Sequence, residues 1–233
     1  MISETGCVDG APRSTFASRL GRITLSDFRK LGTTRKFTAG DQLFMEGDAP
    51  GNVFLVESGS IKVYMISPAG TELILGFRGA GDLLCETSAL EGIPRSTCGT
   101  GRVDGEVTEV SRSAFRSFIR RHPEAMAHVF SVIRDRLRDS DQERLSYASE
   151  SVAARVSRKL ASWAAMYGSP EPGGKVVIRG FSRRELAQSV AAAEKSVDEV
   201  LVALRAAGLI STGRLQIVMN DPHRLLSWPL AQP

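Results

Sequence analysis

Cysteine and histidine are scarce in this sequence, which has three of each among its 233 residues. The cysteines are Cys7, Cys85 and Cys98, and the histidines are His122, His128 and His223. The cysteines are too few and too scattered for a disulfide framework or a four-thiolate metal site, so we expect reduced thiols. The histidines do not have the spacing of metal ligands. No metal is therefore predicted.

Long apolar runs and targeting segments are missing as well. No stretch approaches the ~20 apolar residues that a membrane-spanning helix needs. The N-terminus has no basic segment followed by an apolar run. We therefore expect a cytoplasmic protein without a membrane partner. The sequence also has no nucleophile elbow, phosphate-cradling lysine loop or catalytic dyad, so an enzyme is not expected.

Charge of both signs is present, but it is distributed unevenly along the chain, whose net charge is +4. From Arg155 to the end there are eleven Lys and Arg against six Asp and Glu, an excess of +5. The first 154 residues contain 19 Lys and Arg against 20 Asp and Glu, a net charge of −1. A basic segment joined to a nearly neutral one is typical of a protein in which one part meets phosphates. A basic surface without a partner is the alternative.

The pattern of apolar residues divides the chain into four parts. Residues 1–20 are polar and are expected to form a flexible arm. Residues 21–122 begin with a short helix near 24–31 and continue as short β-rich runs punctuated by glycine, which predicts a small barrel or roll. Residues 123–150 are predicted to form one long helix. Residues 151–233 are predicted to form a small domain of helices and strands. The fold class is α+β.

The long helix carries an apolar stripe, interrupted near Ser140. Its members are Met126, Phe130, Ile133, Leu137, Leu145, Ala148 and Val152. The stripe extends over roughly seven turns, more than the small β-domain beside it can cover. We therefore expect the helix to pair with a second copy of the chain, in a homodimer. The alternative is a helix packed on its own domain.

Two helices and a tight turn are predicted near the C-terminus. Ser182 and Glu185 form a capping box, in which the hydroxyl accepts from one backbone amide and the carboxylate reaches back to another. A turn at 191–193 leads to a second helix that Gly208 ends. The apolar residues on one face of this second helix are Val197, Val200, Leu201 and Leu204.

The stretch LISTGRLQIVMN predicts two short strands around Thr212-Gly213, a β-hairpin wing. Together with the two helices, this makes a winged helix-turn-helix, whose second helix can enter the DNA major groove. The basic excess lies in the same segment, which favours DNA binding. A small helical bundle without such a function is the alternative.

The whole order from Arg35 to Arg224 resembles the catabolite-activator/FNR family of bacterial transcription regulators. The stretches that carry the resemblance are Glu46-Gly-Asp, NVFLVESGSIKVY and GDLLCETSALEGIPRST. They look like the family's cyclic-nucleotide-binding jelly roll with its phosphate-binding cassette. The resemblance covers roughly four-fifths of the chain. It implies an allosteric regulator that binds double-stranded DNA at a pseudo-palindromic operator, with RNA polymerase as a further candidate partner.

A cyclic nucleotide carries one phosphate charge and a ribose 2′-hydroxyl, so its pocket needs a guanidinium, a carboxylate and backbone donors. The ligand-binding residues that the resemblance implies are Cys85, Glu86, Thr87, Arg95, Ser96, Ser140 and Asp141. Glu86 would bind the hydroxyl, Arg95 with Ser96 the phosphate, and Ser140 and Asp141 the base. Cyclic AMP is favoured over cyclic GMP as the effector. The alternative is a Glu86–Arg95 salt bridge that only closes the roll.

The sequence departs from the family pattern in both functional segments. Cys85-Glu86-Thr87 stands where Gly-Glu-Leu is usual, and a side chain in place of glycine can obstruct close approach to the backbone. Glu194 and Glu199 stand where many relatives have arginines that contact guanine. Carboxylates can accept from the cytosine amino group, so we expect an operator that differs from the family's usual half-site.

The DNA-binding residues predicted by this comparison are Arg183, Arg184, Glu194, Lys195, Ser196, Glu199 and Arg214. The arginines would face phosphates and the others base edges. Two alternative functions stay open. One is a regulator of the same build that needs no ligand or responds to another signal, including oxidation of Cys85. The other is an interaction module that has lost DNA binding.

Overall fold

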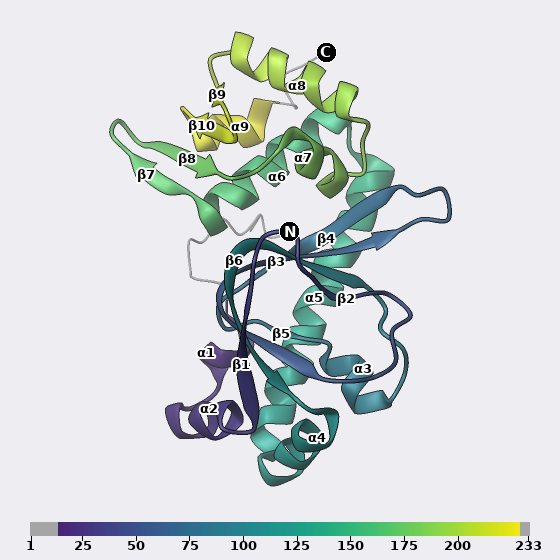
Figure 1. Cartoon of the computed structure of the whole chain (residues 1–233). Coiled ribbons are helices and arrows are strands. Elements are labelled where there is room, and N and C mark those ends of the chain that lie inside the picture. Colours follow the sequence, from purple (N-terminus) through teal and green to yellow (C-terminus); the bar gives the residue numbers. More distant parts are fainter. Residues whose placement is uncertain (1–13, 229–233) are drawn as a thin grey trace, which may run out of the picture. The chain divides into compact units, whose positions relative to one another are not determined.

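The computed structural model describes residues 14–228 and has the predicted α+β architecture (Figure 1). Cys7, most of the predicted arm and residues 229–233 lie outside the described residues. The described chain divides into two compact units, and the boundary between them along the chain lies between Asp141 and Gln142. This point lies inside the long helix α5 (Pro123–Ser149), whereas the sequence suggested domain limits at the ends of that helix.

The first unit is built on an antiparallel roll of six strands. They are β1 (Gly32–Phe37), β2 (Gln42–Phe44), β3 (Val53–Ile66), β4 (Glu72–Gly79), β5 (Leu83–Leu84) and β6 (Cys98–Val110). The main path is β1-β6-β3-β4, with β2 paired to β6 and β5 to β3. Side chains alternate across β3: Val53 and Leu55 join one core cluster, and Phe54 and Val56 join the other. The first four residues of β3 are therefore buried on both faces of the sheet.

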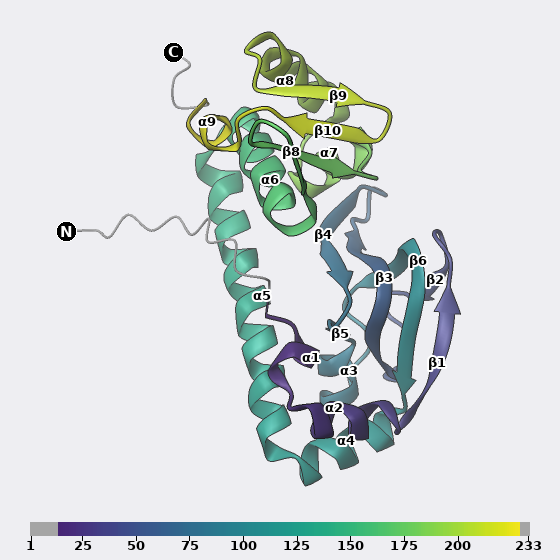
Figure 2. The same ribbon diagram turned by 90° about the vertical axis from the view of Figure 1, so that its left-hand side faces the viewer.

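Short helices cover one end of the roll (Figure 2). They are α1 (Phe16–Arg19), α2 (Arg22–Arg29), α3 (Glu86–Glu91) and α4 (Arg112–Arg121). Phe28 on α2 is fully buried, and its ring meets those of Phe16, Phe115 and Phe118 edge-on, with centroids 5.7, 6.2 and 5.1 Å away. This aromatic cluster joins the N-terminal helices to α4.

The predicted flexible arm is wrong for residues 14–20. Helix α1 begins with a capping box between Thr15 and Ser18. Phe16 is fully buried, and Arg19 Nη2 lies 2.6 Å from Asp135 Oδ2 on α5. A polar stretch becomes ordered here because one phenylalanine and one arginine find partners that are remote in sequence.

The apolar residues of helix α5 occupy two different faces, of which the predicted stripe is the more exposed. Ala125, Val129 and Val132 are buried in the core of the first unit. Phe130 and Leu137 on the predicted stripe are 63% and 56% exposed. The predicted last member, Val152, lies outside α5, because the helix ends at residue 149 and Ser151 caps the next one.

The second unit contains four helices besides the end of α5, and a four-stranded antiparallel sheet of order β7-β8-β10-β9. Its elements are α6 (Val152–Tyr167), β7 (Ser169–Glu171), β8 (Lys175–Arg179), α7 (Arg183–Ser189), α8 (Glu194–Ala206), β9 (Ile210–Gly213), β10 (Gln216–Met219) and α9 (Pro222–Ser227). Strand β7 pairs with β8 at the edge of this sheet. Trp163 stacks on Phe181 with centroids 4.1 Å apart, which packs α6 against the start of the helix-turn-helix.

The helix-turn-helix prediction is confirmed in its local details. Ser182 caps α7 and forms the predicted capping box with Glu185. The turn to α8 contains Ala191 at a positive φ of 50°, a conformation that L-residues adopt at some cost. Gly208, with φ of 70°, follows the end of α8. Strands β9 and β10 form the predicted wing, but its turn lies at Arg214 and Leu215. The predicted turn at Thr212-Gly213 is wrong, because these two residues still pair with Ile217 and Gln216 in the ladder.

Candidate ligand cassette and nucleic-acid interface

The cassette begins at the junction of β5 and α3. Cys85 caps α3 in the left-handed conformation, with φ of 66° and ψ of 16°. This is the backbone geometry that glycine adopts without strain, and a non-glycine residue in it costs of order 1 kcal/mol. The next residue, Glu86, is 3% exposed. The chain therefore places a buried carboxylate directly after a sharp backbone turn.

Arg95 lies on the loop between α3 and β6 and is held by the predicted Glu46-Gly-Asp stretch. Its backbone amide donates to the Asp48 carbonyl at 2.9 Å, and its carbonyl accepts from the Gly47 amide at 2.8 Å. The guanidinium lies over the rings of Phe44 and Phe54, 5.3 and 5.5 Å from their centroids. These contacts fix the side chain before any ligand binds.

The guanidinium of Arg95 is buried and only partly satisfied. The residue is 8% exposed. Its Nη2 donates to the Asn52 carbonyl at 2.9 Å, whereas Nη1 is buried and has no hydrogen-bond partner. A buried cation with an unused donor is costly unless an anion completes it. Such a group has the chemistry of an anion-binding site.

Glu86 makes an ion pair with Arg136 on α5 instead of the Glu86–Arg95 salt bridge considered from the sequence. Arg136 Nη1 donates to Glu86 Oε1 at 2.7 Å, and Nη2 donates to the Leu83 carbonyl at 2.6 Å. The alternative of a salt bridge between the two cassette residues is wrong. Arg136 is a candidate site residue that sequence reasoning missed, and it connects the cassette to the long helix.

The other predicted ligand residues differ in exposure and in the side of the helix on which they lie. Thr87 and Ser96 are exposed. Ser140 is half-buried and lies one turn beyond Arg136 on a similar side of α5. Asp141 is exposed and lies one turn beyond Leu137, on the outward face. The structure thus brings Cys85, Glu86 and Arg95 together, with Ser140 near Arg136 and Asp141 directed elsewhere.

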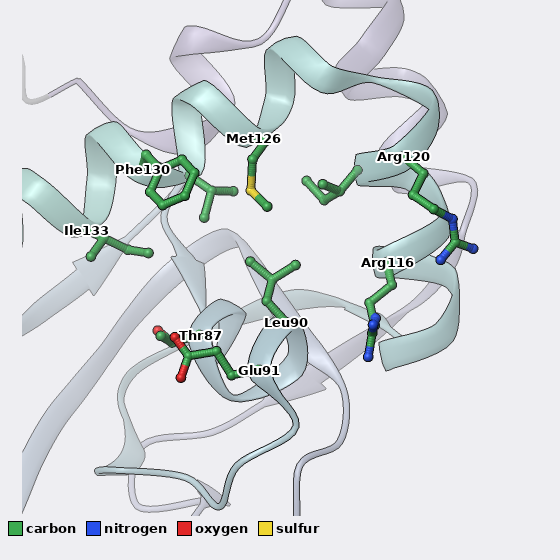
Figure 3. Close-up of a pocket in the computed structure, with 10 residues that line it drawn as sticks. Thr87, Leu90, Glu91, Arg116, Arg120, Met126, Phe130 and Ile133 are labelled. Atoms are coloured by element: carbon green, nitrogen blue, oxygen red, sulfur yellow. The ribbon is translucent and has the colours of Figure 1, made fainter.

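A cavity of about 380 Å³ lies among α3, α4 and α5 (Figure 3). Its apolar wall includes Leu90, Met126 and Phe130. Figure 3 shows two of the four arginines of α4, Arg116 and Arg120, on one side of this wall. Phe130, which lines the cavity, is 63% exposed, so this part of the lining is open to solvent.

Cys85 is expected to react slowly with thiol reagents. Burial raises the pKa of its thiol from 9.0 to about 12, although the nearby Arg95 guanidinium opposes the shift. Only the thiolate reacts, and its fraction grows about tenfold per pH unit below the pKa. Mass spectrometry after brief iodoacetamide treatment should find little alkylation of Cys85 at neutral pH and more in alkaline buffer. Urea-unfolded protein is the control.

Fast alkylation of Cys85 in the folded protein at neutral pH would contradict this prediction. It would also restore the oxidation of Cys85 as a candidate signal. The burial of the thiol argues against that signal, because redox-sensing cysteines are accessible and have low pKa values.

Helix α8 presents the side chains expected at a nucleic-acid interface. Val197, Leu201 and Leu204 face the core of the second unit. Lys195 and Glu199 are exposed on the opposite side, four residues apart. Glu194 is exposed at the first position of the helix, and Ser196 is half-buried. The predicted base-contacting residues are therefore not equally available: Lys195 and Glu199 are presented best.

The three predicted phosphate-contacting arginines are exposed. Arg183 Nη1 lies 3.2 Å from Asp198 Oδ1, so α7 and α8 are joined by an ion pair at the surface. Arg184 lies beside it at the start of α7, and Arg214 lies in the turn of the wing. The first helix, the second helix and the wing each contribute one or more cations.

The described residues 14–228 also bear on metal binding and on membrane insertion. They contain no group of three or more His, Cys, Asp or Glu that could hold a metal ion. In the same part of the chain, no helix is both long enough and apolar enough to cross a membrane.

Comparison with known proteins assigns both units. Residues 34–122 match the model of the cyclic nucleotide-binding domain, and residues 154–228 match that of the Crp-like helix-turn-helix domain. A CRP-like cAMP-activated global transcriptional regulator of Mycobacterium tuberculosis is 25% identical over 225 residues, which cover 97% of this chain and 96% of the relative. The cAMP-activated global transcriptional regulator Vfr of Pseudomonas aeruginosa is 26% identical over 191 residues, covering 80% and 89%.

Among solved structures, the c-di-GMP responsive global regulator CLP of Xanthomonas campestris matches with a TM-score of 0.78 at 24% identity, covering 86% of this chain and 100% of that one. The fold and its two matched domains define a DNA-binding transcription regulator rather than an enzyme. The chain belongs to the catabolite-activator/FNR family.

Proposed function

We propose that this regulator is a homodimer controlled by a cyclic nucleotide bound in the cassette, with cyclic AMP favoured over cyclic GMP. The observation that carries the proposal is the buried Arg95 guanidinium, whose Nη1 lacks a partner. An anionic ligand would complete its hydrogen bonds. The activation of the M. tuberculosis and P. aeruginosa relatives by cAMP supports this choice of ligand.

The residues of the cassette fit such a ligand in part. A cyclic nucleotide supplies one negative phosphate and a ribose hydroxyl. Arg95 is positioned for the charge, and Ser96 next to it is exposed. Glu86 has its Oε1 engaged by Arg136, which leaves Oε2 as its acceptor for a hydroxyl. The side chain of Cys85 is the group that fits less well, because glycine would leave more room beside Arg95.

The outward face of α5 supports a homodimer. Phe130 and Leu137 are 63% and 56% exposed and lie seven residues apart, so they share a face of α5. Large apolar side chains gathered on one exposed face are typical of an interaction site. A second copy of α5 would cover this face, including Phe130, which also lines the cavity (Figure 3). Asp141 on the same face would then meet the partner.

Arg136 offers a route for control. It contacts Glu86 and the Leu83 carbonyl from a helix whose other face carries the proposed dimer contact. A ligand that moves Glu86 would change the contact by which Arg136 holds α5 against the cassette. Ligand can shift the balance between two dimer conformations only through its different affinity for each.

The first test is calorimetric titration of the purified protein with cyclic AMP and then cyclic GMP. Saturable binding of either is the expected result. No heat with either nucleotide, in two buffers of different ionisation enthalpy, would remove cyclic nucleotides from the proposal.

The DNA-binding half of the proposal assigns Lys195 and Glu199 to base edges and Arg183, Arg184 and Arg214 to phosphates. With several cations facing phosphates, affinity for a random duplex should fall steeply as salt rises. Fluorescence anisotropy over a salt series measures this slope. Absence of any salt-dependent affinity would favour an interaction module that has lost DNA binding.

A regulator that needs no nucleotide is the second candidate. Two observations favour it: Cys85 carries a side chain where glycine is usual, and Glu86 is already paired with Arg136. In that case DNA-binding curves with and without nucleotide would coincide.

A further inference from the structure

One side chain on α8 does not match the chemistry of the helix around it. Within α8, all of whose residues the structure describes, Val202 is the only large hydrophobic side chain that is exposed, at 55%. The core of the unit takes Val197, Leu201 and Leu204 from this helix and does not use Val202. A β-branched residue also adds nothing to helix stability at an exposed position. Val202 is therefore not explained by the folding of this unit.

The position of Val202 is that of a base-contacting residue. An α-helix turns by roughly 100° per residue. Lys195, Glu199 and Val202 therefore lie within roughly 60° of one another, on the side of α8 that faces away from the core. Ala206, exposed one turn further, leaves this face unobstructed beyond Val202. The face thus presents an ammonium, a carboxylate and an isopropyl group to a partner.

These three groups correspond to three features of the major groove. Lysine donates to guanine, a carboxylate accepts from the cytosine amino group, and apolar side chains contact the C5-methyl group of thymine. The thymine methyl is the apolar group that this groove displays. A lysine or arginine at position 202 would instead add a sequence-independent phosphate contact.

We infer that Val202 is a specificity-determining residue that contacts a thymine methyl group in the operator half-site. The inference rests on the proposed entry of α8 into the major groove. Val202 follows Lys195 by seven residues, or roughly 10 Å along the helix axis. Base pairs are about 3.4 Å apart along the DNA axis, so the thymine lies at most about three steps from the base pair that Lys195 contacts.

The test begins with a duplex selected by the wild-type protein from a randomised pool. Each thymine of the half-site is then replaced in turn by uracil, which lacks only the methyl group. One position should lose about fourfold in affinity, the value expected for burying a single methyl group. With Val202→Ala, the thymine duplex should bind more weakly and the uracil replacement should have no further effect.

Val200→Ala is the matched control, because Val200 is half-buried on another side of the same helix. It should keep the full loss on uracil replacement. Circular dichroism confirms that each variant is folded. If the wild-type protein binds a specific duplex but no uracil position matters, or if the loss persists in Val202→Ala, the inference is overturned and the proposed DNA binding stands. If no duplex is selected at all, both fail.

Discussion

Replacing Arg95 with alanine is expected to lower the affinity for a cyclic nucleotide by at least about 100-fold. Removal of one partner from a buried, charge-assisted contact costs about 2–5 kcal/mol, and each 1.4 kcal/mol is about tenfold in affinity. The loss should be near the upper end of this range. Phe44, Phe54 and Asn52 already hold the Arg95 side chain in place, so binding costs little side-chain entropy there. Calorimetric titration of wild type and variant measures the difference.

Two variants control for this result. Lys36→Ala removes an exposed cation from β1 of the same unit and should leave the affinity unchanged. Arg95→Lys keeps the charge but loses the paired donors of the guanidinium, so its affinity should fall between those of the wild type and Arg95→Ala. A nucleotide that binds Arg95→Ala as tightly as wild type would show that the ligand lies elsewhere.

Replacing Arg136 with alanine is expected to destabilise the first unit by about 3–5 kcal/mol. The reason is the burial of Glu86, whose side chain is 4% exposed and depends on the guanidinium of Arg136 at 2.7 Å. Without the arginine, a carboxylate would remain in the interior without a counter-ion, and the Leu83 carbonyl would lose its donor. Urea unfolding, followed at one fixed protein concentration, measures the change.

The matched control is Arg134→Ala, two residues away, where an exposed arginine pairs with Asp135. Exposed pairs contribute less than about 1 kcal/mol, so this variant should unfold close to wild type. The double variant Glu86→Gln, Arg136→Met should recover much of the stability lost in Arg136→Ala, because it removes the buried charge together with its partner. Equal unfolding midpoints for Arg134→Ala and Arg136→Ala would show that the buried ion pair contributes little.

The features that the sequence predicted well are those that depend on neighbouring residues. The capping box of Ser182 and Glu185 needs only three residues of separation to form, and the structure has it. The wing likewise follows from a short turn between two apolar runs. Arg95 could be singled out because a phosphate-binding pocket needs a guanidinium and the family cassette that this segment resembles has an arginine there.

The features that escaped prediction depend on which side of a helix meets its surroundings. Arginines occur at several positions of α5, and only the packing of α5 against α3 decides that Arg136 faces Glu86. Val202 lies between Leu201 and Leu204, so its exposure is visible only once the core of the unit is known. Helix α1 was missed because its one large apolar residue, Phe16, is buried by Phe28 and other residues distant in sequence.

The double-sided burial of β3 also affects what happens when the protein unfolds. The run from Val53 to Val56 contains four consecutive apolar, β-prone residues without charge, which is the composition of an aggregation-prone segment once water can reach it. Asn52 and Glu57 flank the run, and both are tied down in the folded roll, through Glu109 and Arg29. Variants that loosen this unit should therefore be lost to aggregation, and their soluble yield at growth temperature should fall before their ligand affinity does.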